Sequence, residues 1–270
     1  MAKTKTATPK KAPETADPNK KVFVASAEAK GKASQLRLFA IILWILAIAA
    51  EGFAIFKLLQ GGSNPNMVLL IILIVVDLIL AITGSILWKK AQKLDPPSQK
   101  NGVEFFIKSQ LGAIMMVIAF LPLLIIILMD KDLPGKQKGI LGIIVGVLLA
   151  VGIIAGINFN PESIEKYTDQ INQVESLMGT DTVYWITTGD SGYKYHLYED
   201  CQHISGKEIT SGKVGDALEQ NKIKELCGTC KNRAEKAQAE GGGAQDADTG
   251  TDDATQGGDE GDEGDEAEAS

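Results

Sequence analysis

Four long apolar runs constrain this chain more than any other feature of its sequence. Each run is about 19–22 residues long. Because a helix rises about 1.5 Å per residue, roughly 20 residues cross the hydrocarbon core of a bilayer. We therefore expect four membrane-spanning helices within residues 37–158. The runs cover residues 38–59, 67–88, 111–129 and 139–157.

The rest of the chain is far more polar, and this contrast excludes other architectures. A single soluble globule or a fully disordered chain would not concentrate its apolar residues in one region. The chain has 3 cysteines in 270 residues, so it is not a disulfide-rich secreted scaffold. The first apolar run follows 37 mostly polar residues and is too long for the core of a signal peptide, so we expect it to remain as an anchor.

Lysine and arginine in the loops predict the orientation of the helices. Residues 1–37 and 89–110 carry nine and five of these residues, whereas residues 60–66 and 130–138 carry none and three. Positive residues collect on the cytoplasmic side of a membrane. The sequence therefore predicts a multi-pass protein of the cell membrane with both termini in the cytoplasm.

Two acidic residues interrupt the apolar runs. Glu51 lies in the first run and Asp77 in the second, and a short loop makes these helices antiparallel neighbours at similar depth. A carboxyl inside a membrane is costly and often functional, and two close carboxyls favour sharing a proton. A site for a proton or cation and a hydrogen-bonded staple between helices both remain open.

Residues 159–180 predict an amphipathic linker helix. Asn160, Pro161 and Glu162 are typical of a helix start. Apolar residues then follow at steps of three and four, as in a heptad seam. Two heptads do not establish a coiled coil, so a stalk packed on its neighbours and a dimer zipper both remain open. The seam residues are Ile164, Tyr167, Ile171, Val174 and Met178.

Residues 181–238 predict a small α+β module. Residues 182–188 and 193–198 are rich in β-branched and aromatic side chains and flank a Gly-Asp-Ser-Gly turn, which indicates a hairpin. Residues 211–220 favour a short helix, and the chain from Lys231 onward is again helix-prone.

Every cysteine and histidine of the chain lies within this module, between His196 and Cys230. The pair Cys227-x2-Cys230 can supply two thiolates to one ion, and Cys201 with one histidine completes a Cys₃His set, which is usual for structural zinc. The core of such a small module is thin, so a metal would help it to fold. His196 and His203 are the two candidates for the fourth ligand.

Other chemistry for these residues is less favoured. An odd number of cysteines in the cytoplasm argues against a disulfide framework. No βαβ pattern precedes the Cys-x2-Cys pair, as a redox motif would require. No nucleophile–base pair is evident, and no residue is singled out as the base of a catalytic zinc, so we do not expect an enzyme.

The stretch Tyr195-His196, Cys201 and Cys227-Gly-Thr-Cys230 resembles small bacterial zinc modules related to the metal-binding domain of the Ada DNA-repair methyltransferase. The resemblance covers about 50 residues of 270 and implies a bacterial source. It places His196, Cys201, Cys227 and Cys230 at the ligand positions. His196 stands one residue further from Cys201 than the family spacing suggests, which keeps His203 as the rival.

We do not expect the methyl transfer or DNA binding of that relative. Residues 181–240 carry eight Lys or Arg residues against ten Asp or Glu residues. DNA binding needs positive side chains to neutralise phosphate, so no nucleic-acid partner is expected.

The two ends of the chain predict disorder. Residues 1–36 form a basic arm that could lie on anionic lipid headgroups, and residues 239–270 form an acidic tail. The expected partners are the lipid bilayer, a protein that binds the module or the tail, and a second copy of the chain.

The whole sequence thus predicts an α-helical polytopic membrane protein with four transmembrane helices, a cytoplasmic module with structural zinc and disordered termini. An interaction, scaffold or regulatory role is the leading hypothesis. The alternative is a small transporter or ion-linked sensor that uses Glu51 and Asp77.

Overall fold

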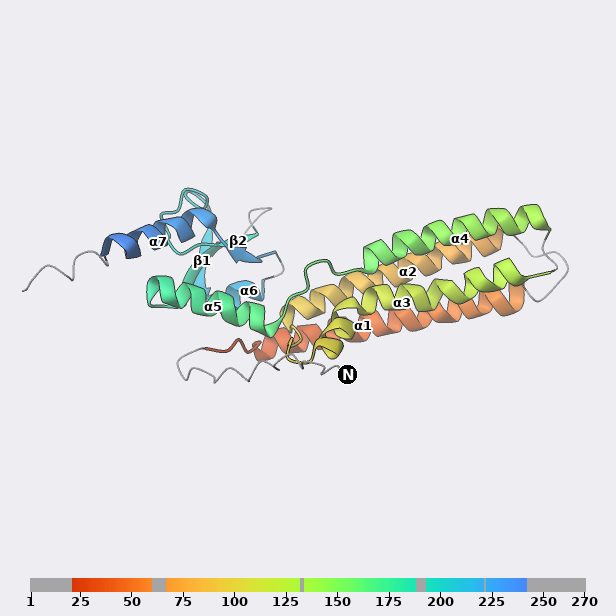
Figure 1. The fold of residues 1–270 in the computed structure, drawn as a ribbon, viewed down its shortest axis with the longest axis horizontal. Helices are drawn as coiled ribbons and strands as arrows, with labels where there is room; N and C mark the ends of the chain where they lie inside the picture. Colours follow the sequence, from red (N-terminus) through yellow and green to blue (C-terminus); the bar gives the residue numbers. More distant parts are fainter. Residues whose placement is uncertain (1–20, 60–66, 132–133, 188–192, 221, 242–270) are drawn as a thin grey trace, which may run out of the picture.

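The computed structural model describes residues 21–59, 67–131, 134–187, 193–220 and 222–241. The molecule is elongated, with a bundle of long helices at one end and a small α+β module at the other (Figure 1). The basic arm over residues 1–20 and the acidic tail over residues 242–270 lie outside the described residues. The bundle consists of α1 (Ala27–Phe53), the π-helix η1 (Ala54–Leu59), α2 (Met67–Leu94), α3 (Gly102–Met129) and α4 (Gly135–Gly156).

These four long helices confirm the expected number of apolar helices, and each is long and apolar enough to cross a membrane. Their inner faces form an aliphatic core, in which Leu70, Phe120 and Val145 are fully buried. Their outer faces remain apolar, as the exposure of Ile79 and Ile143 shows. Apolar surface of this extent on a helix bundle suits contact with lipid rather than water.

Helix α1 begins well before the predicted span, and the predicted disordered arm is wrong over residues 21–36. Ser26 caps the helix, because its side-chain oxygen accepts a hydrogen bond from Ala29 N at 3.1 Å. Ala29 and Ala33 are then buried in a core that also contains Ala91 and Leu94 of α2 and residues of the module. The start of α1 is ordered because distant segments cover its alanine face, which a local reading of the sequence cannot show.

Helices α3 and α4 approach each other closely through glycine. A Cβ added at Gly156 would lie 2.7 Å from the backbone nitrogen of Ala113. Gly152 and Gly156, four residues apart on α4, therefore pack inside the bundle, as small residues at this spacing do in lipid. Lys89 then caps the end of α4, since its Nζ donates to the carbonyl oxygens of Ala155 at 2.6 Å and Ile157 at 2.8 Å.

The linker helix α5 (Ile164–Met178) begins later than expected. Its N-cap is Ser163, whose side chain accepts from Lys166 N at 3.0 Å, and not Asn160. Tyr167 is buried, and its hydroxyl donates to the carbonyl oxygen of Lys93 at 3.1 Å. The heptad seam thus packs on the bundle and the module within one chain, which favours the packed stalk over the zipper.

The module contains two small sheets and two helices. Strand β1 (Thr182–Ile186) pairs antiparallel with β3 (Ile209–Lys213), with Thr182 opposite Lys213. Strand β2 (Lys194–Tyr195) pairs parallel with β4 (Glu225–Leu226). Helix α6 (Val214–Leu218) follows β3 directly, and α7 (Gly228–Gly241) follows β4 after one residue.

Two local expectations for the module are wrong. The expected hairpin is reduced to a single bridge between Tyr184 and His196, since β1 takes β3 as its main partner. The helix expected over residues 211–220 begins only at Val214. Residues 209–213 instead form the strand that pairs with β1. Gly212 in this strand packs under Trp185, since an added Cβ would lie 2.7 Å from Trp185 Cη2.

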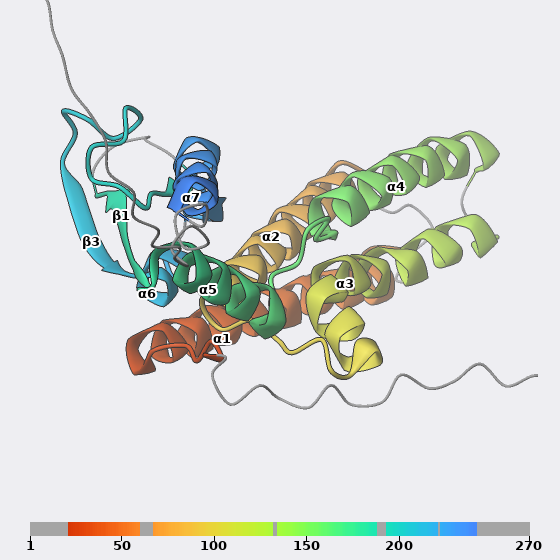
Figure 2. The same ribbon diagram turned by 60° about the vertical axis from the view of Figure 1, so that its left-hand side comes forward.

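One hydrophobic core joins the module to the near ends of α1 and α2. It contains Phe23, Ala33 and Leu94 from the bundle side together with Tyr195 and Cys201 from the module. Figure 2 shows the start of α1 lying beside α6, where Ser26 binds Glu219. This shared core sets the position of the module at the base of the bundle.

Candidate metal centre

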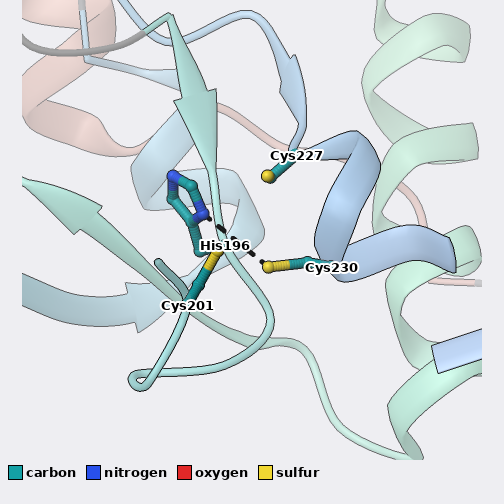
Figure 3. A group of neighbouring side chains, drawn as sticks. All are labelled: His196, Cys201, Cys227 and Cys230. Carbon is teal, nitrogen blue, oxygen red and sulfur yellow. Dashed lines mark hydrogen bonds between the residues drawn. The ribbon is translucent and has the colours of Figure 1, made fainter. Parts of the chain in front are cut away.

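The three cysteines and one histidine meet inside the module (Figure 3). His196 follows β2, and its backbone exchanges two hydrogen bonds with Tyr184, at 2.7 and 2.8 Å. Cys201 begins a tight turn, where its carbonyl oxygen accepts from Ile204 N at 2.9 Å. Cys227 lies between β4 and α7, and Cys230 is in the first turn of α7.

The pairing of β2 with β4 brings the two halves of the cluster together. Cys227 N donates to the carbonyl oxygen of Tyr195 at 2.9 Å, which continues the parallel ladder beside His196. Lys231 N donates to the carbonyl oxygen of Cys227 at 3.0 Å and so starts α7 at the knuckle. Backbone hydrogen bonds of the strands, the turn and the helix therefore bring the four side chains together without a bound ion.

The geometry of the four ligand atoms suits a tetrahedral ion. These atoms all lie within 4.8 Å of one another, and Cys230 Sγ lies 3.7 Å from His196 Nδ1. Zinc bonds of about 2.0–2.3 Å would hold tetrahedral ligand atoms roughly 3.5–3.8 Å apart. His196, Cys201, Cys227 and Cys230 are thus close enough to bind a metal ion, and a sulfur-rich set is consistent with zinc.

All four side chains are buried, and burial shapes their protonation. It lowers the pKa of His196 to about 4, so the ring is neutral at pH 7 and has a free lone pair. It raises the pKa of the Cys230 thiol to about 12. Burial also acts to raise the pKa of Cys227, but backbone N–H groups of Cys230 and Thr229 lower it overall. Metal binding would therefore release protons from buried thiols.

His203 lies outside the cluster. Its Nε2 is 3.1 Å from the hydroxyl oxygen of Thr229, its ring centroid is 6.4 Å from that of His196, and its side chain is exposed. The structure thus brings His196, and not His203, to the three sulfur atoms.

A pair of contacts around the cluster was not expected from the sequence. Arg233 Nη1 donates to both carboxylate oxygens of Asp200, at 2.8 and 3.0 Å, and its guanidinium lies 4.1 Å from the ring centroid of Tyr198. These contacts tie the turn before Cys201 to α7. Arg233 stands three residues after Cys230, one helical turn along α7, and this spacing is the only sequence signal that could have indicated it.

The two intramembrane carboxyls lie inside the bundle. Glu51 and Asp77 are both buried, and Glu51 Oε1 accepts a hydrogen bond from Leu123 N of α3 at 3.2 Å. Glu51 therefore makes a hydrogen bond between two helices, as one of the two open interpretations predicted, but its partner is the backbone of α3 and not Asp77. Leu123 follows Pro122, where a proline inside a helix disturbs the backbone ladder.

Comparison of this chain with protein-family models, with characterised proteins and with solved structures finds no match. The class of protein therefore rests on the fold and the cluster. Four apolar helices and a Cys₃His cluster are compatible with a membrane protein that carries a zinc module.

Proposed function

We propose that this chain is a multi-pass membrane protein whose cytoplasmic module holds one structural zinc ion and serves an interaction, scaffold or regulatory role. The observation that carries this proposal is the buried Cys₃His cluster, with its four ligand atoms within 4.8 Å of one another. Structural zinc sites are closed shells of four protein ligands, whereas catalytic sites keep a position open for water or substrate.

The ligand chemistry supports zinc over other divalent ions. Thiolates are soft ligands that select zinc, copper(I) or iron–sulfur clusters, whereas magnesium and calcium prefer oxygen. A tetrahedral set that includes one imidazole favours zinc among these. With all four positions filled by the chain, the metal would hold the shape of the module, and its surface would contact a partner.

The shared core supports one side of the membrane for both flanks. Phe23 precedes the first span and Tyr195 follows the fourth, yet both belong to the same hydrophobic core. This shared core supports placing the two flanks on one side of the membrane, and the lysine-rich loops favour the cytoplasm. A protein partner of the module or of the acidic tail fits this placement better than nucleic acid, because residues 181–240 carry a net negative charge.

Elemental analysis of the purified full-length protein tests the zinc site. We expect one zinc ion per chain in the wild type, loss of tight binding in His196→Ala, and wild-type zinc content in His203→Ala. The two variants remove the same side chain from positions seven residues apart, so each controls for the other. A metal-free protein with three freely alkylated thiols would contradict the proposal.

Protease treatment of sealed membrane vesicles tests the orientation. In inside-out vesicles the acidic tail should be cleaved, and in right-side-out vesicles it should be protected. Cleavage in right-side-out vesicles would place the module outside the cell and remove the argument for a cytoplasmic partner.

A further inference from the structure

Asp77 is the most isolated polar side chain in the described part of the bundle. It lies near the middle of α2 with only 2% of its surface exposed. Neither of its carboxyl oxygens has a hydrogen-bond partner, and neither can be reached by a water molecule. A carboxylate in this position would carry an uncompensated charge inside a membrane, which is energetically costly.

Glu51 is the other buried carboxyl of the bundle, and it lies on α1, which packs along α2. Only 6% of its surface is exposed. Two neighbouring carboxyls without a cation are most stable when they retain at least one proton between them. The burial of both groups therefore favours protonation of the pair.

The apolar runs of the other two long helices supply no further titratable group. The apolar runs 111–129 and 139–157, which lie in α3 and α4, contain no acidic, basic, histidine, cysteine or tyrosine residue. The first run also holds Lys57, six positions after Glu51 in η1. The second run contains no titratable residue besides Asp77.

The helices are irregular where the pair lies. The π-helix η1 begins three residues after Glu51, and Pro122 interrupts α3 next to the amide that Glu51 binds. A π-helix is a rare backbone geometry, and a proline inside a helix marks a kink. These features come from the backbone, so they are independent of the charge argument.

We propose that Glu51 and Asp77 form an intramembrane proton-binding site. A proton needs no cavity, whereas a sodium or potassium ion would need several oxygen ligands and space beside Asp77, whose oxygens are enclosed. The site joins three helices, because Glu51 also binds the Leu123 amide. A charged acceptor makes a stronger hydrogen bond than a neutral one, so the charge on Glu51 controls how tightly α1 is held to α3.

Infrared spectroscopy of the full-length protein in lipid vesicles tests this site. Surface carboxyls are ionised between about pH 6 and pH 9, so only enclosed acids show the C=O band of a protonated carboxyl there. We expect such a band at neutral pH, with its loss as pH rises. Labelling with ¹³C-aspartate should shift one component of the band, and labelling with ¹³C-glutamate should reveal whether Glu51 shares the proton.

Variants assign the band to the pair. Asp77→Asn should remove the aspartate component, and it should change the pH range over which any glutamate component titrates, because the two groups interact. Glu51→Gln should change the titration of the aspartate component in the same way. The control is Glu104→Gln, which neutralises an exposed carboxyl on α3 and should leave the band unchanged.

Three outcomes would overturn the proposal. The wild type could show no protonated-carboxyl band near neutral pH, a result that requires no variant and no assumption about folding. The band could persist in Asp77→Asn and Glu51→Gln alike. Replacing a bulky organic cation in the buffer by sodium could shift the pH at which the carboxyl band is lost, which would identify the pair as a cation site instead. Because none of these readouts depends on the zinc content, the test stands apart from that of the metal centre.

Discussion

The bundle and the module bury their interiors by different means. The bundle packs long helices around an aliphatic core, and lipid can cover its apolar outer face. The module has short elements, with strands of two and five residues, and its core includes three cysteines and alanines from α1 and α2.

This difference shows which region can stand on its own. A helix satisfies its backbone hydrogen bonds within itself, so each apolar run is self-sufficient in a membrane. Strands as short as β2 and β4 are only marginally stable without further support. We therefore expect the module to depend on the metal cluster and on the bundle more than the membrane-spanning part of the bundle depends on the module.

Metal removal should produce the largest effect and should separate the two regions. A strong chelator, or the variant Cys227→Ser, should unfold the module, because structural zinc contributes about 10–16 kcal/mol of apparent binding free energy in small domains. The bundle should keep its helices. Limited proteolysis with mass spectrometry would show cleavage appearing within residues 181–238, while circular dichroism would report the helices that remain.

The control for metal removal is His203→Ala, which leaves the four ligand atoms in place and should resist protease like the wild type. A module that stays protease-resistant after complete loss of metal would show that its core suffices without zinc. The module would then not need metal for its stability, and it would not differ from the bundle in this respect.

The contact of Phe23 with the module should give the next largest effect. Phe23 is buried, with its ring packed edge-on against Tyr167 at a centroid distance of 4.9 Å. Phe23→Ala should reduce the free energy of unfolding of the module by about 3–5 kcal/mol, as for other buried phenylalanines. Hydrogen exchange of residues 164–240 would measure this loss. Val24→Ala is the matched control, because 71% of Val24 is exposed and its loss should be nearly neutral.

Gly156→Ala should act on the bundle instead. The added methyl group meets the backbone of α3 at Ala113, and overpacking of this kind typically costs about 1–3 kcal/mol. Thermal unfolding in micelles would show a lower transition temperature with the zinc content unchanged. Gly146→Ala is the control, because nothing lies within 4 Å of its added methyl group, so the change should be neutral or stabilising. Equal effects of the two variants would argue against close α3–α4 packing.

Ser26→Ala should have the smallest effect, at the boundary between the regions. Ser26 caps α1, and its hydroxyl donates to Glu219 Oε2 at 2.7 Å. Loss of the cap should cost about 1 kcal/mol and speed hydrogen exchange in residues 26–36. Ser34→Ala, at an exposed position of the same helix, should leave that exchange unchanged. If Ser26→Ala also leaves it unchanged, α1 does not depend on its docking to the module.

The sequence predicted the parts whose signals are local. Four apolar runs of about 20 residues suffice to predict four long helices, since length and hydropathy alone determine whether a segment can span a bilayer. The clustering of Cys201, Cys227 and Cys230 with the histidines likewise indicated the metal residues. Neither inference needed to know which elements touch.

Other expectations failed because their cause lies far away in the chain. Residues 21–36 looked like a polar arm, yet Phe23 packs against Tyr167, more than a hundred positions later, and Ala33 is buried in the same core. Residues 209–213 became a strand because β1 pairs with them and Trp185 covers Gly212. Local propensity is weak enough for such contacts to override it.

The sequence by itself therefore determined the number of long helices and the residues available for a metal, because hydrophobic length and ligand type are properties of a segment. Only the tertiary structure decided which histidine joins the sulfur atoms, that Glu51 binds α3, and that Asp77 has no partner. These outcomes depend on distances of a few ångströms between separate elements. Such distances arise from the packing of the whole chain, and no pattern within one segment encodes them.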